Sequence, residues 1–242
     1  MNETNDRPNE SKRYSLAIRG WYRLIRGLVG LLLRLLTRIE VEGKEHIPAQ
    51  GGYMLASNHL HWLDTPVLAV VFPHRPYVFA ADKWARHFFL GPLLRSTDAI
   101  FVRRGEVDRK ALRQAFDLLS GGGILGLAPE GTRSKTGALQ QGRSGPAYMA
   151  LRTGVPLLPV VLTGQEKALP TLRRLRRPTI HVRFGPLFEP PDVQGKATPE
   201  QVDAFTQEIM YRLAAMLPPE YRGVYANVEQ VRPDLVAAAT KA

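Results

Sequence analysis

The stretch ASNHLHWLDTPVLAVV, residues 56–71, decides the fold class of this chain. It completes a short apolar run of strand type, Tyr53 to Ser57, and then turns through polar residues into a helical pattern at Asp64. An aspartate at the N-cap followed by Pro66 in the first turn is typical of a helix start. A strand that turns into a helix within a few residues is the repeating unit of α/β domains, so this stretch predicts that class.

Strand and helix patterns alternate outward from this stretch along the whole chain. The segments with strand character are Ile39 to Glu42, Tyr53 to Ser57, Tyr77 to Ala80, Ala99 to Arg103, Ile124 to Ala128, Leu157 to Leu162 and Thr179 to Phe184. Helical patterns start at Asp64 and cover residues 83–94, 108–120, 143–153 and 198–217, the last one opened by the capping-box sequence TPEQ. The sequence therefore predicts an α/β fold with a central mixed or mostly parallel sheet of about seven strands, flanked by helices.

Composition narrows the class of protein and its partners. The chain has 242 residues, of which 44% are hydrophobic, so it is long enough for one α/β domain with a real core. It contains no cysteine, which excludes disulfides, thiolate nucleophiles and thiolate metal sites. The formal net charge of +11 predicts a polyanionic partner: nucleic acid, an anionic membrane surface or a phosphorylated substrate.

An apolar segment that contains several arginines precedes the domain. Its arginines fall on about one third of a helix circumference, and they are Arg19, Arg23, Arg26, Arg34 and Arg38. Its longest uncharged run, Gly27 to Leu33, is far shorter than the roughly 20 residues that a membrane-spanning helix needs. The pattern favours an amphipathic helix that lies on a membrane surface, and the alternative is an ordinary helix packed on the domain.

These boundaries predict four regions. Residues 1–13 form a polar leader, 14–38 the interfacial amphipathic helix, 39–217 the main domain, and 218–242 a loosely docked C-terminal tail. The leader is too polar for a signal peptide, and no small-residue cleavage site follows the apolar segment.

His59 and Asp64 are five residues apart, across the predicted turn between strand and helix. If the turn is tight, the two side chains meet, and a carboxylate then holds the imidazole in one tautomer. Such a histidine is suited to take a proton from an alcohol. The alternative for this pair alone is a helix cap beside a partly buried histidine.

A second polar turn, LAPEGTRS at residues 127–134, follows another strand. Strand ends of this kind usually bind ligands in α/β folds, and Arg133 is a natural clamp for a phosphate. Glu130 can accept hydrogen bonds from backbone amides of the turn or orient an arginine. A surface turn with a solvated arginine is the alternative.

Four blocks taken in order, NHLHWLD, AIFVRR, PEGTRS and VPLLPV, resemble the motifs of the 1-acyl-glycerol-3-phosphate acyltransferase family, in the glycerolipid acyltransferase superfamily. The resemblance spans roughly residues 40–190. It implies transfer of a fatty acyl group from an acyl thioester to a lysophospholipid hydroxyl, without a covalent acyl-enzyme. It also implies that His59 is the general base and that Asp64 fixes its tautomer. The resemblance further assigns acceptor-binding residues, which are Lys83, Arg104, Glu130, Gly131, Thr132 and Arg133.

The chain departs from the family pattern at a few positions. Asp98 stands where glycine is usual, Ala128 replaces a larger apolar residue, and Leu60 and His61 replace small polar ones. His61 is therefore a rival base. Because it lies two residues after His59, its side chain is expected to point away from the carboxylate of Asp64. Aspartate rather than glutamate at the end of the first motif leans away from the lipid A acyltransferase branch.

The expected acceptor is 1-acyl-glycerol-3-phosphate, the product phosphatidic acid, and the expected partners are anionic membrane lipids and acyl-CoA or acyl carrier protein as co-substrate. No cofactor, metal or nucleic acid is expected, because the histidines are scattered and no stacking platform or DNA-binding motif appears. The expected location is the cytoplasmic face of the membrane, as a peripheral or monotopic protein. The alternatives are another lysolipid or aminolipid acceptor, or a basic membrane-binding protein without catalysis.

A second basic cluster lies at residues 173–177. It predicts a solvated loop or, alternatively, a contact for anionic lipid or acyl carrier protein.

Overall fold

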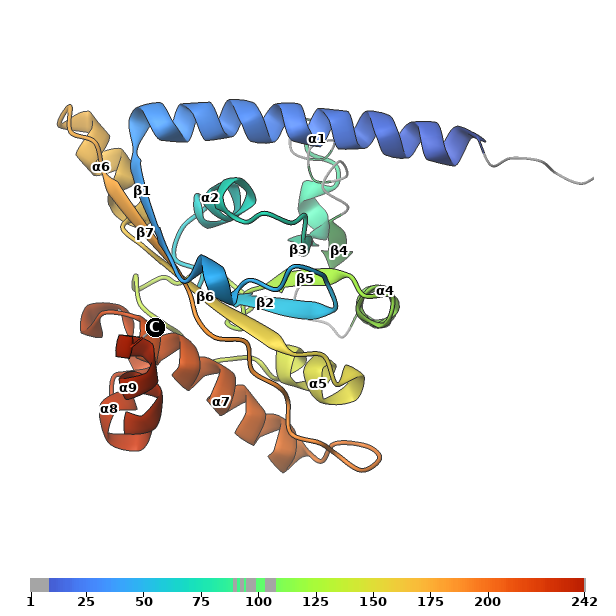
Figure 1. The fold of residues 1–242 in the computed structure, drawn as a ribbon, viewed down its shortest axis with the longest axis vertical. Coiled ribbons are helices and arrows are strands. Elements are labelled where there is room, and N and C mark those ends of the chain that lie inside the picture. The colour runs from blue at the N-terminus through green and yellow to red at the C-terminus, as the bar shows by residue number, and fades with distance from the viewer. Residues whose placement is uncertain (1–8, 89–90, 92–93, 95–98, 103–107, 242) are drawn as a thin grey trace, which may run out of the picture.

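The computed structural model describes residues 9–88, 91, 94, 99–102 and 108–241. Its centre is a seven-stranded sheet in the order β1-β7-β6-β2-β5-β3-β4 (Figure 1). The strands are β1 (Arg38–Glu42), β2 (Tyr53–Ser57), β3 (Tyr77–Ala81), β4 (Ile100–Val102), β5 (Ile124–Leu127), β6 (Leu157–Thr163) and β7 (Thr179–Phe184). All neighbouring strands pair in parallel except β6 and β7, which are antiparallel. The predicted α/β fold with a mostly parallel sheet is confirmed.

The helices follow the strands in the expected alternation. They are α1 (Asn9–Leu36), α2 (Asp64–Val71), α4 (Arg109–Ser120), α5 (Ser144–Thr153), α6 (Ala168–Arg173), α7 (Pro199–Met216), α8 (Val228–Val231) and α9 (Pro233–Lys241). Thr198 and Gln201 form the predicted capping box at the start of α7. The prediction of a helix from residue 83 is wrong at its start, because Asp82–Trp84 form a single 3-10 turn; part of the remainder lies outside the described residues.

The strands alternate their side chains between two apolar layers. In β2, Tyr53 and Leu55 join the core beneath α1 and α2, whereas Met54 and Ala56 join the core against α4, α5 and α7. Figure 1 shows the same division, with α2 between α1 and the sheet and with α5 and α7 on the opposite face. Because both faces are covered, β6 is buried along its whole length and is apolar except for Thr163 at its end.

Helix α1 lies across one end of this sandwich, and its orientation corrects the sequence prediction. Arg26 faces the protein, where it donates hydrogen bonds to the carbonyl oxygens of Val70 at 3.1 Å and Phe72 at 2.8 Å. Arg38 belongs to β1, so the five arginines do not form one outward stripe. The outward face of α1 is apolar instead, and its exposed side chains are Trp21, Leu24, Leu28, Leu31, Leu32, Leu35 and Leu36. Within the part of the chain that the structure describes, no helix meets the length and hydropathy needed to cross a bilayer.

The C-terminal residues are docked firmly, which corrects the expectation of a loose tail. Tyr225 and Val228 are buried with residues of α7, and Leu235 and Ala239 of α9 join the same cluster. The Tyr225 hydroxyl accepts a hydrogen bond from the backbone N–H of Gly142 at 3.1 Å. Apolar residues at short intervals among the prolines and glycines supply this contact, and sequence reasoning took those breakers as evidence for a tail.

Candidate active site

His59 and Asp64 meet at the carboxyl end of β2, as their spacing predicts. His59 Nδ1 lies 2.7 Å from Asp64 Oδ2. Asp64 is 2% exposed, whereas the His59 side chain is 23% exposed and so reaches the surface. Because a carboxylate only accepts, the proton of the neutral imidazole lies on Nδ1 and a lone pair is left on Nε2. The histidine is thus left with one free ring nitrogen, Nε2, which could accept a proton.

Asp64 is the centre of a small buried network rather than a helix cap. It is the first residue of α2, and its side chain makes no capping hydrogen bond; Leu63 takes the N-cap position. Besides His59, Asp64 Oδ2 accepts from the backbone N–H of His61 at 3.0 Å. Its other oxygen, Oδ1, accepts from Gln165 Nε2 at 2.9 Å. Three donors to one buried carboxylate fix its position.

Gln165 and Asn58 are the two members of this arrangement that sequence reasoning missed. Both are fully buried, and both tie the first motif to the end of β6. Asn58 donates to Leu162 O at 2.9 Å and accepts from Leu162 N at 2.8 Å. Gly164, at a φ of +89°, makes the turn that delivers Gln165, since a Cβ there would lie 2.3 Å from Thr179 O. The available signal was a polar amide residue within two positions of the end of a buried strand.

Glu130 lies behind His59 and accepts hydrogen bonds from backbone N–H groups, which is one of the two roles that the sequence suggested for it. It is 1% exposed, and both carboxylate oxygens are used within the protein. Oε1 accepts from the backbone N–H of His59 and Oε2 from that of Gln140, both at 2.9 Å. Burial raises the pKa of Glu130, although these hydrogen bonds oppose the shift. Glu130 therefore holds the backbone of His59 in place.

The turn that follows Glu130, from Gly131 to Ser134, lies beside His59. The backbone N–H of Ser134 donates to His59 O at 2.7 Å, which fixes the two motifs side by side. Gly131 has a φ of +70°, a conformation that favours glycine. Arg133 and Gly131 are exposed and Thr132 is half-buried. Arg133 takes part in no ion pair with another residue that the structure describes, so its guanidinium is available to an anion.

The remaining predicted acceptor residues are only partly placed. Lys83 lies in the 3-10 turn after β3, and its side chain is outside the described part. Arg104, two residues after β4, lies outside the described residues. The structure thus brings together residues of the first and third motifs with Leu162 and Gln165, which follow the fourth motif.

His61, the rival base, does not share the carboxylate through its ring. Only its backbone N–H donates to Asp64, and its Nδ1 accepts a long hydrogen bond from Leu63 N at 3.4 Å. Burial lowers the pKa of His61, and the positive charge of Arg133 lowers it further, while Asp64 and Glu166 oppose the shift. The charge effect also indicates that Arg133 lies on the same side of the site. Among the described residues, no group of three His, Asp or Glu side chains is arranged to hold a metal ion.

Comparison with known proteins identifies relatives of this chain. The model of the family described as Acyltransferase matches residues 38–163. The chain is 24% identical over 199 residues to a 1-acyl-sn-glycerol-3-phosphate acyltransferase of Bacillus subtilis, covering 79% of this chain and 94% of that protein. It is 30% identical over 127 residues to a protein of the same name from Borreliella burgdorferi, covering 52% of this chain and 51% of that one.

A solved structure shares the fold. The crystal structure of the 1-acyl-sn-glycerophosphate acyltransferase of Thermotoga maritima superposes with a TM-score of 0.63 at 21% identity, over 93% of this chain and 83% of that chain. The matched family region contains the His59 and Asp64 pair, the Glu130 turn and all but the end of the strand-to-Gln165 segment. Since that region covers more than half of the sequence, this chain belongs to the acyltransferase family.

Proposed function

We propose that this protein transfers a fatty acyl group from an acyl thioester to the free hydroxyl of 1-acyl-glycerol-3-phosphate, giving phosphatidic acid. The observation that carries the proposal is the His59 to Asp64 hydrogen bond of 2.7 Å, made by an imidazole whose side chain is partly exposed. The names of the relatives from Bacillus subtilis and Borreliella burgdorferi support this acceptor.

The reaction needs one proton to travel from the acceptor to the leaving group. His59 Nε2 takes the proton of the lysolipid hydroxyl as its oxygen attacks the thioester carbonyl carbon. Asp64 stabilises the imidazolium that forms and keeps the tautomer correct. As the tetrahedral intermediate collapses, the C–S bond breaks and the imidazolium returns the proton to the leaving thiolate. A new C–O ester bond and a free thiol result, without an acyl-enzyme.

Arg133 is the proposed phosphate ligand of the acceptor. It is exposed, unpaired among the described residues, and close enough to His61 to lower the pKa of that ring. A guanidinium can hold a phosphomonoester with two parallel hydrogen bonds, which fixes the lipid relative to His59. Arg104 and Lys83 are proposed as further contacts of the acceptor, on the strength of the motif resemblance alone.

The acyl donor is proposed to be a thioester of coenzyme A or of acyl carrier protein, and no other cofactor is needed for the chemistry. The basic surface of the chain suits both donors, since coenzyme A and acyl carrier protein are anionic. The choice between them is part of the experiment below.

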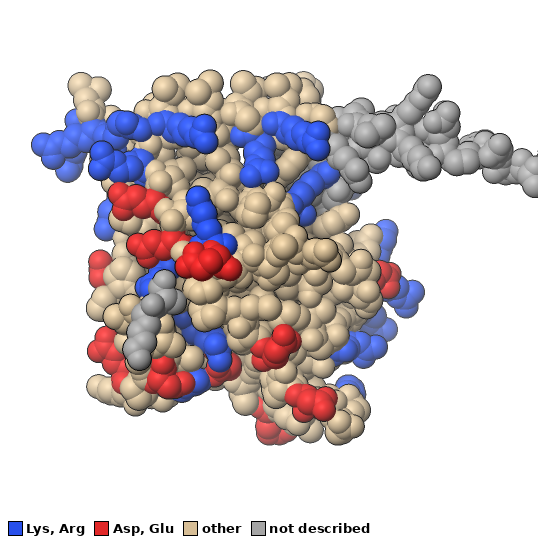
Figure 2. Space-filling model, viewed as in Figure 1, with Lys and Arg blue, Asp and Glu red and all other residues tan. Residues whose placement is uncertain are grey.

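The proposed place of action is the cytoplasmic face of a membrane. Figure 2 shows the upper edge of the molecule, which α1 forms in Figure 1, largely without charge and with Lys and Arg gathered just beneath it. Among the described side chains of α1, seven large apolar ones are exposed, from Leu36 at 41% to Leu35 at 65%. An apolar face that enters the lipid, with cations at the depth of the phosphates, is the arrangement of an interfacial helix.

The experiment uses the purified protein with a panel of lysolipids and with acyl-CoA and acyl-acyl carrier protein, read by product mass. Phosphatidic acid from lysophosphatidic acid is the expected product. If another lysolipid or an aminolipid is acylated and lysophosphatidic acid is not, the same chemistry serves a different acceptor. Absence of any acylated product with either donor would contradict the proposal.

A further inference from the structure

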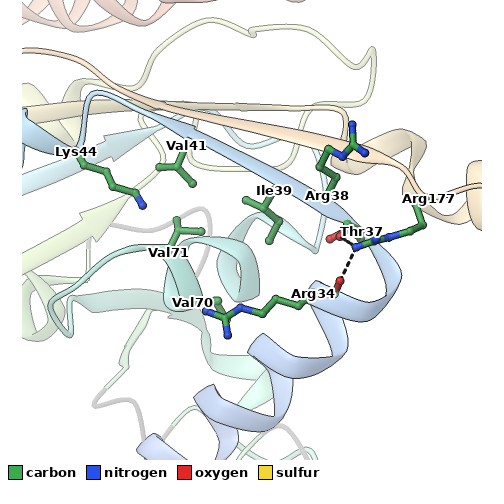
Figure 3. Close-up of a pocket in the computed structure, with 9 residues that line it drawn as sticks. All are labelled: Arg34, Thr37, Arg38, Ile39, Val41, Lys44, Val70, Val71 and Arg177. Carbon is green, nitrogen blue, oxygen red and sulfur yellow. Dashed lines mark hydrogen bonds between the residues drawn. The ribbon is translucent and has the colours of Figure 1, made fainter.

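A surface pocket of about 420 Å³ lies under the C-terminal end of α1, at the β1 edge of the sheet (Figure 3). Its lining residues are Arg34, Thr37, Arg38, Ile39, Val41, Lys44, Val70, Val71 and Arg177. It meets the last turn of α2, whereas Asp64 begins that helix about 10 Å away along its axis. None of the catalytic or acceptor residues named above lines it. The pocket is therefore separate from the candidate active site.

The pocket combines an apolar floor with basic walls. The side chains of Ile39, Val41, Val70 and Val71 are half-buried there. Figure 3 shows the Arg34 guanidinium reaching beside Val70 and the Lys44 side chain directed toward Val71. This mixture suits a ligand with an anionic group joined to an apolar one, rather than a fully polar ion.

One of the four cations already has a structural task. Arg177 donates to Arg34 O at 2.6 Å and to Thr37 O at 2.8 Å, so it satisfies carbonyl groups at the end of α1. It is therefore more than part of a solvated loop. The other three, Arg34, Arg38 and Lys44, appear in none of the ion pairs between described residues.

The nearest acidic residues of β1 are kept off the pocket. Side chains alternate along a strand, and Glu40 and Glu42 lie on the face opposite Ile39 and Val41. There they pair with His181 at 3.1 Å and Arg183 at 3.6 Å. Among the described residues, the lining contains no carboxylate. The positive charge of the pocket is thus not neutralised from within.

We propose that this pocket binds the headgroup of an anionic phospholipid drawn from the membrane surface. Its phosphate lies among Arg34, Arg38 and Lys44, and the start of its acyl chains contacts the apolar floor. The proposal rests on the proposed docking of α1 on a membrane, because the exposed Leu31, Leu35 and Leu36 belong to the helix end that borders the pocket. A free phosphate ion would satisfy the cations but leave the apolar floor without a partner. A lipid bound here would hold the domain at a fixed depth and angle on the bilayer.

The test places a reporter beside the pocket. Because the chain has no cysteine, Glu45→Cys accepts a single environment-sensitive dye next to Lys44. In the control, Lys110→Cys on α4 carries the same dye far from the pocket, near the opposite edge of the sheet. Each labelled protein is titrated with dihexanoyl phosphatidylglycerol below its micelle concentration. We expect a saturable signal at position 45 and none at position 110. Dihexanoyl phosphatidylcholine and glycerol phosphate should give much weaker responses.

Charge variants then test the pocket itself. In the position-45 protein, Arg34→Gln with Lys44→Gln should weaken binding roughly 30-fold, from the usual contribution of a cation near a lipid phosphate. Arg173→Gln with Arg174→Gln removes the same charge from exposed residues at the end of α6, outside the pocket, and should change binding less than threefold.

Three results would overturn the proposal: no response at position 45, equal weakening by the two double variants, or equal binding of glycerol phosphate and the lipid. Acyl transfer to detergent-dispersed lysolipid is measured on the same proteins. It should be unchanged by Arg34→Gln with Lys44→Gln. If the labelled Glu45→Cys protein binds lipid but neither it nor the wild-type protein transfers an acyl group, the result would contradict the proposed function alone.

Discussion

Gln165 Nε2 donates a 2.9 Å hydrogen bond to Asp64 Oδ1, across 101 residues of sequence. Asp64 uses its other oxygen for His59, so the amide and the imidazole hold the carboxylate from two sides. Both Gln165 and Asp64 are buried, at 0% and 2% exposure, and water does not replace a lost partner easily. The orientation of His59 therefore depends on a residue at the end of β6.

Gln165→Leu should lower kcat about 10-fold to 100-fold while leaving the KM for the acceptor nearly unchanged. A hydrogen bond to a buried charge is worth about 1.5–3 kcal/mol, and its loss acts on the position of the base rather than on substrate contacts. Steady-state kinetics and thermal unfolding check this. Gln194→Leu removes a comparable amide-to-carboxylate bond, to Asp192 on the surface, and should change neither quantity. A rise in KM alone would argue that Gln165 contacts the lipid instead.

Glu130→Gln should reduce kcat about 10-fold or more, because an amide has one acceptor oxygen and Glu130 receives two backbone N–H groups, those of His59 and Gln140.

The same variant tests how Glu130 makes the stability of the protein depend on pH. Burial raises the pKa of Glu130 above its usual 4.5, so its protonated form favours the folded state. The wild-type protein should lose unfolding free energy relative to the variant as pH rises from about 4.5 through the raised pKa. Denaturant unfolding at several pH values measures this difference, and a constant difference would contradict it.

Arg133→Gln should raise the KM for lysophosphatidic acid about 10-fold to 100-fold and leave the KM for the acyl donor within a factor of two. The reason is the loss of a charge-assisted contact with the phosphate. Lys135→Gln removes an equally exposed cation two residues away and serves as the matched control. Initial rates with each substrate varied in turn give the KM for the acceptor and the KM for the donor in both variants. Equal changes in both constants would show that Arg133 does not select the acceptor phosphate.

The two faces of α1 should respond differently to substitution. Leu28 and Leu32 are 59% and 55% exposed, so Leu28→Ser with Leu32→Ser should weaken vesicle binding about 10-fold or more without lowering the melting temperature. Arg26→Gln loses the bonds to Val70 O and Phe72 O and should cost about 1–3 kcal/mol of unfolding free energy. Vesicle sedimentation and denaturant unfolding measure the two effects. Unfolding of the double serine variant would indicate that this face packs within the protein.

The sequence predicted the sheet well because strands in a doubly covered sheet are short apolar runs bounded by turn residues. Residues 53–57 and 179–184 were predicted to the residue, and the His59 to Asp64 contact followed from a local turn. The Gln165 contact could not be predicted, since it depends on β6 lying beside β2 in the sheet. Nothing in a local pattern gives that neighbour relation.

Two further features could not be predicted for the same reason. The arginines of α1 share one side of a helical projection, but periodicity does not say which side faces the protein, and Arg26 donates to carbonyl groups at the C-terminal end of α2. The sequence suggested that Glu130 accepts from backbone amides, but not that the amides are those of His59 and Gln140. In both cases the missing information is tertiary packing.

The most direct test of the account compares His59→Ala with His61→Ala in single-turnover acyl transfer to lysophosphatidic acid, with product read by mass. Of these two histidines, only His59 makes a hydrogen bond to the Asp64 carboxylate through its ring, whereas His61 makes one through its backbone N–H. We expect His59→Ala to lower the rate about 10³-fold or more, and His61→Ala to lower it less than 10-fold, with both proteins folded by circular dichroism. A His59→Ala protein that retains a rate within 10-fold of wild type, or a His61→Ala protein that loses it, would contradict the account.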